Sequence, residues 1–202
     1  NSENLKNIKR WSSEILNGNV YEKLHSLSID NKFKCVDPRD WWNGFKIMEF
    51  NILKDLESKV SWISNFIIHN ANNLRLKEDD LKVGGHQASC ASVISILVVL
   101  YFKILNKFDR IAIKPHASPV YHAIQYLLNN QSLENLKNFR KFNGAQAYPS
   151  ITKDFCDVDF STGSVGLGGA MTIFSSIVQD YLYSNDFLKN KNKSKMISIF
   201  GD

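Results

Sequence analysis

The chain has 202 residues and a net charge of +5, and it is 44% hydrophobic and 22% charged, as ordinary globular proteins are. These values exclude collagen-like, mucin-like and disordered chains, and no apolar run reaches the ~18–20 residues that span a bilayer. The basic segment 189–195 is interpreted as a solvated loop, so neither nucleic acid nor a membrane is an expected partner. The three cysteines, Cys35, Cys90 and Cys156, are odd in number and form no CxxC pair, which argues against a disulfide framework or a zinc site and predicts a reducing compartment, the cytoplasm.

The first half of the chain is predicted to be helical. Residues 1–44 are expected to form a polar helical arm that ends in a turn-rich junction at 36–44. Apolar side chains recur at helical spacing over 45–76, and a loop that contains glycines follows at 81–89. Residues 89–105 are apolar on nearly every side, which predicts a buried helix.

The second half alternates strands with helices. Residues 110–114 predict a short strand, and Ser118 and Pro119 are typical of the N-cap and first position of a helix that ends near residue 129. A further helix is expected to begin after Ser132. The remaining predicted elements are an irregular loop over 141–163, a helix over 166–183 and a strand over 195–200.

This order of elements is typical of an α/β fold with an open, mostly parallel sheet flanked by helices. The two predicted strands are followed by Pro115-His116 and by Gly201-Asp202. Ligands bind beyond the carboxyl ends of the strands in such sheets, so we expect His116 and Asp202 to lie near a ligand. The abrupt end directly after a strand suggests a fragment of a longer protein.

Three segments carry candidate chemistry, and each also has a purely structural interpretation. Gly84-Gly85-His86 begins the sequence GGHQAS, and two prolines flank His116 in KPHASP. A glycine-rich turn at 161–170 resembles the start of a phosphate-binding helix, or a simple packing turn. It is neither a P-loop, because no Lys follows Gly168-Gly169, nor a dinucleotide fingerprint, because residue 171 is Met.

Taken together, the segments GGHQAS, KPHASPVYHAIQYLL, NFRKFNGAQAYPS, DFSTGSVGLGGA and FGD, which span about residues 84–202, resemble the thiamine-diphosphate enzymes of the transketolase superfamily. Within it, the chain is most similar to the homodimeric pyruvate dehydrogenase decarboxylating components. The resemblance implies that residues 45–202 are the first part of the diphosphate-binding domain, cut inside its GDG…N metal motif. It also implies thiamine diphosphate and Mg²⁺ as cofactors.

The resemblance assigns roles residue by residue. His86 and His116 match histidines beside the substrate and the cofactor, and Asp202 matches a metal ligand that also serves the cofactor. The implied cofactor contacts are Ser89, Lys114, His116, Val165, Gly166 and Leu167. Lys114 departs from the Gln that is common at its position in the better-known pyruvate enzymes. Two histidines of near-neutral pKa suit proton transfer at a substrate oxygen.

The expected function is therefore that of a 2-oxo-acid (pyruvate) dehydrogenase component, which decarboxylates the substrate and passes on the acyl group. A transketolase that moves ketol units between sugar phosphates is the alternative enzyme. A nucleotide-binding module and a non-catalytic scaffold subunit are the alternatives from other classes. The expected partners are a 2-oxo acid or ketose phosphate, a second copy of the full-length chain and a lipoyl acyltransferase. The fragment alone is expected to be inactive.

Overall fold

The computed structural model describes residues 38–76, 82–163, 165–188 and 194–201, with side chains from residue 50 onward. It divides into two compact units, residues 1–56 and 57–202. Most of the predicted N-terminal arm lies outside the described residues. No helix in the described part of the chain is both long enough and apolar enough to cross a membrane.

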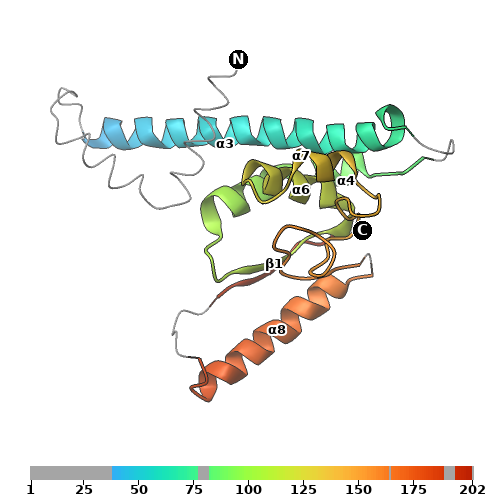
Figure 1. Cartoon of the computed structure of the whole chain (residues 1–202). Helices are drawn as coiled ribbons and strands as arrows, with labels where there is room; N and C mark the ends of the chain where they lie inside the picture. Colours follow the sequence, from blue (N-terminus) through green and yellow to red (C-terminus); the bar gives the residue numbers. More distant parts are fainter. Residues whose placement is uncertain (1–37, 77–81, 164, 189–193, 202) are drawn as a thin grey trace. The chain divides into compact units, whose positions relative to one another are not determined.

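The longest element is helix α3, Pro38–His69, which Figure 1 shows as one continuous helix. A π-helical turn, η1 (Asn70–Leu74), follows it directly. The predicted helix over 45–76 is thus confirmed, but the predicted turn-rich junction is wrong from residue 38 onward. A proline favours the first helical position because its missing N–H has no intrahelical partner there, so Pro38 starts the helix rather than a turn.

The predicted buried helix over 89–105 is instead a broken series. It consists of α4 (Gln87–Ala91), α5 (Ile94–Val99) and the π-helical turn η2 (Leu100–Ile104). Val93, with φ −125° and ψ 0°, leaves the helical conformation between α4 and α5. Serine and β-branched residues have low helix propensity, so local preference does not hold the segment in one helix. Ile96 is half exposed, which contradicts the prediction of burial all round.

The expected parallel sheet is confirmed in the described residues as two strands, β1 (Arg110–Ala112) and β2 (Met196–Ser198). The buried carboxylate of Asp109 fixes their amino ends, because it accepts the N–H of Lys195 at 2.8 Å and the N–H of Asn106 at 3.1 Å. Because the two strands are parallel, the residues that follow each of them leave the sheet at the same end. We call this end of the sheet the carboxyl edge.

The chain leaves β1 through a 3₁₀ turn, η3 (Pro115–Ala117), and enters α6 (Ser118–Leu127). Ala117 is the N-cap of α6, so the prediction that Ser118 caps this helix is wrong: Pro115 already starts a helical turn three residues earlier. Helix α7 is Leu133–Lys137, and its predicted cap is confirmed, since Ser132 Oγ accepts the N–H of Asn135 at 3.1 Å.

Residues 141–163 form the expected irregular loop, and α8 (Leu167–Ser184) follows it. Two glycines let α8 pack closely on the sheet. A Cβ at Gly168 would lie 3.2 Å from the Ala112 Cβ, and one at Gly169 would overlap the ring of Phe200. Gly168 and Gly169 therefore serve close packing, which is one of the two interpretations predicted for the glycine-rich segment.

A hydrophobic cluster joins the end of α3, η1, α7 and the start of the irregular loop. Its buried members are Ile67, Ala71, Leu136, Phe139 and Ala145. Val83, at the start of the loop that leads to His86, packs against this cluster.

Candidate active site

The two histidines that the sequence singled out lie face to face. The ring centroids of His86 and His116 are 4.1 Å apart, and the ring planes are inclined by 15°. His86 directly precedes α4, and His116 belongs to η3, so two separate segments bring them together. In the described part of the chain, no hydrogen bond engages a ring nitrogen of either residue. Their nitrogens are therefore available to a ligand.

Glycine is required in the loop that carries His86. Gly84 and Gly85 have φ of +85° and +141°, conformations that other residues rarely adopt. A Cβ at Gly85 would lie 2.8 Å from Ile68 Cγ2. Asn72 holds the loop from η1, because its amide accepts the N–H of Gly84 and donates to the Gly84 carbonyl, both at 3.0 Å. The loop is fixed by these contacts, so His86 has a defined position.

The surroundings of His86 keep its imidazole neutral. Loss of water around the ring lowers the pKa of His86, and the nearby His116 and Arg140 lower this pKa further. Because the ordinary value is about 6.5, the ring is mainly uncharged at neutral pH. A neutral imidazole donates from one nitrogen and accepts at the other, which suits proton transfer to and from a substrate oxygen.

Lys114 places a buried cation at the carboxyl edge. Its side chain is 8% exposed, and its Nζ donates to Ser92 Oγ at 3.2 Å. Nζ also lies against Gly201 beyond β2, only 2.6 Å from where a Cβ on that glycine would be. Lys114 makes no ion pair with any residue that the structure describes. A buried cation at this position suits an anionic ligand.

Two buried hydroxyl groups, one on α4 and one at the end of β2, are potential ligand contacts. Within the described residues, the buried Oγ atoms of Ser89 and Ser198 make no hydrogen bond. Ser89 lies on α4, and the Ser92 hydroxyl that bonds Lys114 donates back to the Ser89 carbonyl at 2.9 Å. Ser198 ends β2 and lies near the start of α8, at 3.7 Å from the Cβ position of Gly168. Buried hydroxyls without partners indicate room for a polar ligand.

The glycine-rich turn presents an open surface at the start of α8. Gly166 is the N-cap, with φ of +76°, and nothing lies within 4 Å of its Cβ position. Val165 is 87% exposed and Leu167 is 43% exposed. Thr162 ties the preceding loop to the carboxyl edge by donating its hydroxyl hydrogen to the Ile113 carbonyl at 3.2 Å. The predicted metal ligand Asp202 lies outside the described residues.

Three residues near the pair were not predicted from the sequence as contributors to the site: Asn72, Ser92 and Arg140. Arg140 donates to the Val83 carbonyl in front of His86 at 2.6 Å. Their partners lie 12, 22 and 57 residues away, so no local spacing indicates these contacts. The only signal in the sequence is that Arg140 lies in NFRKFNGAQAYPS, one of the segments that carry the family resemblance.

A second group of potential metal ligands lies apart from the pair: His122, Asp154 and Cys156. Its atoms are already engaged in folding the irregular loop. The carboxylate of Asp154 accepts the N–H groups of Gln146 and Ser150, and His122 Nε2 bonds the Gln146 carbonyl at 2.8 Å. Burial lowers the pKa of His122, so this ring is neutral. His122 is a structural histidine, as predicted from its place inside a helix.

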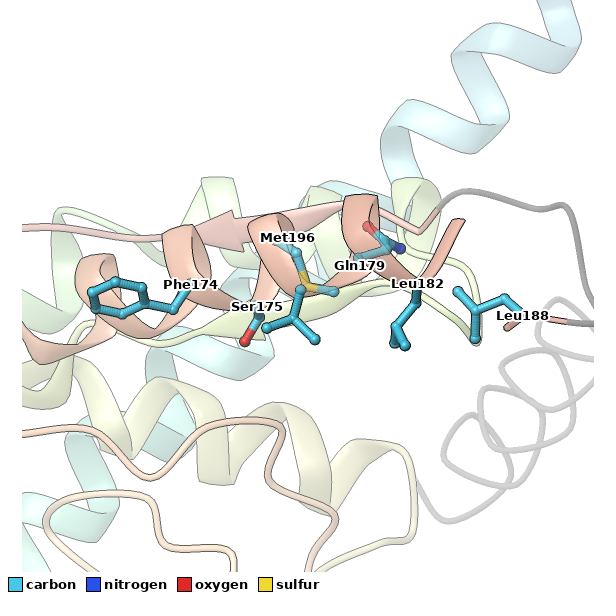
Figure 2. Close-up of a pocket in the computed structure, with 7 residues that line it drawn as sticks. Phe174, Ser175, Gln179, Leu182, Leu188 and Met196 are labelled. Carbon is cyan, nitrogen blue, oxygen red and sulfur yellow. The ribbon is translucent and has the colours of Figure 1, made fainter. Parts of the chain in front are cut away.

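A groove of about 410 Å³ lies elsewhere, between α8 and β2. Figure 2 shows Phe174, Leu182 and Met196 along it, and none of the predicted site residues lines it. Its lining is mainly apolar and contains no titratable side chain. The groove therefore offers no acid–base chemistry, and the candidate site is the histidine pair with the carboxyl edge.

Known proteins resemble the chain over most of its length. It is 27% identical over 198 residues to the pyruvate dehydrogenase E1 component of Buchnera aphidicola from Schizaphis graminum, which covers 89% of the chain and 21% of the relative. The E1 component of Haemophilus influenzae is 30% identical over 162 residues, covering 75% of the chain and 17% of the relative. That of Escherichia coli K12 is 31% identical over 140 residues, with coverages of 64% and 15%.

The resemblance to pyruvate dehydrogenase E1 components is confirmed. The chain spans about a fifth or less of the length of the curated relatives that it matches. No protein-family model matches the chain. The relatives are named for pyruvate dehydrogenase and not for ketol transfer, so the comparison does not favour the transketolase alternative.

Proposed function

We propose that the chain is the first part of the diphosphate-binding domain of a pyruvate dehydrogenase E1-type enzyme that depends on thiamine diphosphate and Mg²⁺. The single observation that carries this proposal is the stacked pair of His86 and His116 beside the carboxyl edge. The motifs alone assign the same pair to substrate and cofactor. The relatives' names supply the substrate class, a 2-oxo acid.

The residues at the carboxyl edge fit the proposed cofactor. Lys114 is a buried cation with no ion pair in the described residues, and it suits the negatively charged diphosphate. The buried hydroxyls of Ser89 and Ser198, which have no partner in the described residues, are further potential donors. The exposed turn of Val165, Gly166 and Leu167 suits backbone contacts with the aminopyrimidine ring. Asp202 is proposed to be a ligand of the Mg²⁺.

The histidines are proposed to handle the proton on the substrate oxygen. Thiamine diphosphate supplies a nucleophilic ring carbon and an electron sink for decarboxylation. A neutral His86 is able to donate its N–H to the substrate's keto oxygen as negative charge develops there. His116, in ring contact with His86, is placed to exchange a proton with the same oxygen. Lys114 and the serines bind and orient, and they take no part in the proton transfer.

The family resemblance also suggests an oligomeric state, a location and a partner for the intact protein. The intact protein is expected to be a homodimer, to lie in the cytoplasm and to pass the acyl group to a lipoyl acyltransferase. Cys90 is a free buried cysteine, and burial raises the pKa of its thiol to about 11. The 202-residue chain alone is expected to be inactive.

The proposal is tested by CO₂ release from pyruvate in the intact protein that contains this chain. We expect release only when both thiamine diphosphate and Mg²⁺ are added. If the protein binds the cofactor but releases no CO₂ from pyruvate, the substrate assignment is wrong, and ketol transfer between sugar phosphates becomes the next assay. If the cofactor does not bind, the proposed function as a whole is wrong.

A further inference from the structure

Arg140, in the turn after α7, contacts the loop that carries His86. Its Nη1 donates to the Val83 carbonyl at 2.6 Å, although the two residues lie 57 positions apart in the sequence. The same nitrogen packs against Gly84, so that a Cβ on this glycine would lie 2.7 Å from it. The absence of a side chain at position 84 is therefore what allows the guanidinium group to approach.

The backbone around Arg140 holds its side chain in this direction. Arg140 has φ of +62°, an unusual conformation for a residue with a side chain. The turn is fixed because the Arg140 N–H donates to the Ala145 carbonyl at 2.9 Å and the preceding residue, Phe139, is fully buried. Strained positions of this kind persist only where surrounding contacts enforce them, and they are frequent at functional sites.

We propose that Arg140 is a positioning residue for the histidine pair, because it fixes the Val83–Gly85 loop so that His86 stays stacked on His116. The role of the pair in catalysis rests on the proposed function, whereas the positioning itself does not. Asn72 of η1 also hydrogen-bonds this loop. Arg140 and Asn72 therefore bind adjacent residues of it, Val83 and Gly84.

The charge of Arg140 adds a second effect on His86. Among the described residues, the charged or titratable groups that act on His86 are His116 of η3 and Arg140 after α7, and both disfavour a proton on the ring. Partial loss of water acts in the same direction. Arg140 therefore helps to keep His86 in the neutral form, which is able both to donate and to accept a hydrogen bond.

NMR titration of the histidine ring protons in the full chain tests the proposal without any assay of activity. The variants are Arg140→Gln, which removes the charge and shortens the side chain, and Arg140→Lys, which keeps the charge. Arg75→Gln is the matched control. Arg75 donates to the Phe139 carbonyl at 2.8 Å in the same turn, but it is not among the groups that act on His86.

We expect Arg140→Gln to raise the pKa of His86 and to weaken the nuclear Overhauser effect between the rings of His86 and His116. Arg140→Lys should leave the pKa closer to that of the original protein, and Arg75→Gln should leave both readouts unchanged. The proposal is overturned if Arg140→Gln changes neither readout, or if Arg75→Gln changes both to the same extent.

Arg140→Lys keeps the proposal testable if Arg140→Gln does not fold. A lysine has a single terminal nitrogen and no planar guanidinium group, so it should hold the Val83 carbonyl less firmly than arginine does. The nuclear Overhauser effect between the two rings should therefore weaken in Arg140→Lys, even though the pKa of His86 stays low. A ring-to-ring effect as strong as in the original protein would overturn the positioning role.

These results separate the inference from the proposed function. A shift of the His86 pKa in a protein that does not bind thiamine diphosphate would support the positioning role and refute the proposed function. An unchanged His86 in a protein that does release CO₂ from pyruvate would do the reverse. The inference and the proposed function thus fail in different experiments.

Discussion

The chain contains two histidine environments that differ in burial and in hydrogen bonding. His86 and His116 stack at 4.1 Å, with ring nitrogens that make no hydrogen bond in the described residues. His122 is fully buried, and its Nε2 bonds a backbone carbonyl at 2.8 Å. A histidine whose nitrogens are satisfied within the fold holds a loop in place. A histidine that is firmly positioned but lacks such partners is available for chemistry.

The largest effect that tests this contrast is on turnover. Replacing His86 or His116 with Ala in the intact protein should lower kcat for CO₂ release from pyruvate by about 10²–10⁴-fold, the range for loss of an acid–base group. The melting temperature should hardly change, because neither ring forms part of the core. Steady-state kinetics with thermal unfolding as the control checks this. Full activity in both variants would remove the histidine pair from the mechanism.

His122→Ala should show the opposite pattern, with stability as its main readout. The substitution leaves the Gln146 carbonyl without this partner, removes one of the two partners of the buried Gln131 Nε2, and opens a cavity beside Phe139. Each unsatisfied buried group costs about 1–3 kcal/mol, so the free energy of unfolding should fall by about 2–4 kcal/mol. Urea unfolding measures this change. A variant as stable as the original protein would show that the His122 network contributes nothing to the fold.

Lys114→Met tests the carboxyl edge itself. A charge-assisted contact is worth about 1.5–3 kcal/mol, so loss of the cation should weaken thiamine diphosphate binding about tenfold or more. The stability of the cofactor-free protein should be equal or higher, because a buried charge is removed. Isothermal titration with the cofactor and Mg²⁺ gives the affinity, and Lys195→Met on the exposed end of β2 is the matched control. Equal affinity in the two variants would contradict the assigned role of Lys114.

The smallest effect is on the pH dependence of stability. Burial lowers the pKa of His122, so the unfolded chain binds a proton that the folded chain resists. The contribution is complete above the unfolded value of about 6.5, and it is lost as the pH falls, at up to about 1.4 kcal/mol per pH unit. Unfolding curves between pH 7.5 and pH 5 check this expectation. The free energy of unfolding should depend less steeply on pH in His122→Gln than in the original protein. An identical pH dependence would show that another group binds the proton.

The contrast between the two environments also explains what could be predicted from the sequence. The motifs around His86 and His116 are local, and the strand that precedes His116 has a clear apolar pattern, so both residues could be proposed as site residues. The parallel pairing followed from strands separated by helices. His122 could be recognised as structural because it lies inside an apolar helix. Local patterns therefore identify the candidate residues.

The parts that could not be predicted depend on contacts between distant segments. The break at Val93 divides a run that looks like one buried helix, because packing rather than propensity sets its geometry. Arg140 reaches Val83 through a backbone conformation that no pattern indicates. Gly168 and Gly169 serve packing, while Gly166 faces open space, and the glycine spacing alone does not separate these roles.

The central claim is that the histidine pair lies beside the cofactor that the carboxyl edge binds. Histidine modification by diethyl pyrocarbonate, followed by mass spectrometry in the intact protein, tests it most directly. Saturating thiamine diphosphate and Mg²⁺ should slow the modification of His86 and His116, while the exposed His69 reacts as before and the buried His122 stays unreactive. Unchanged modification rates for His86 and His116 in the cofactor-saturated protein would contradict the account.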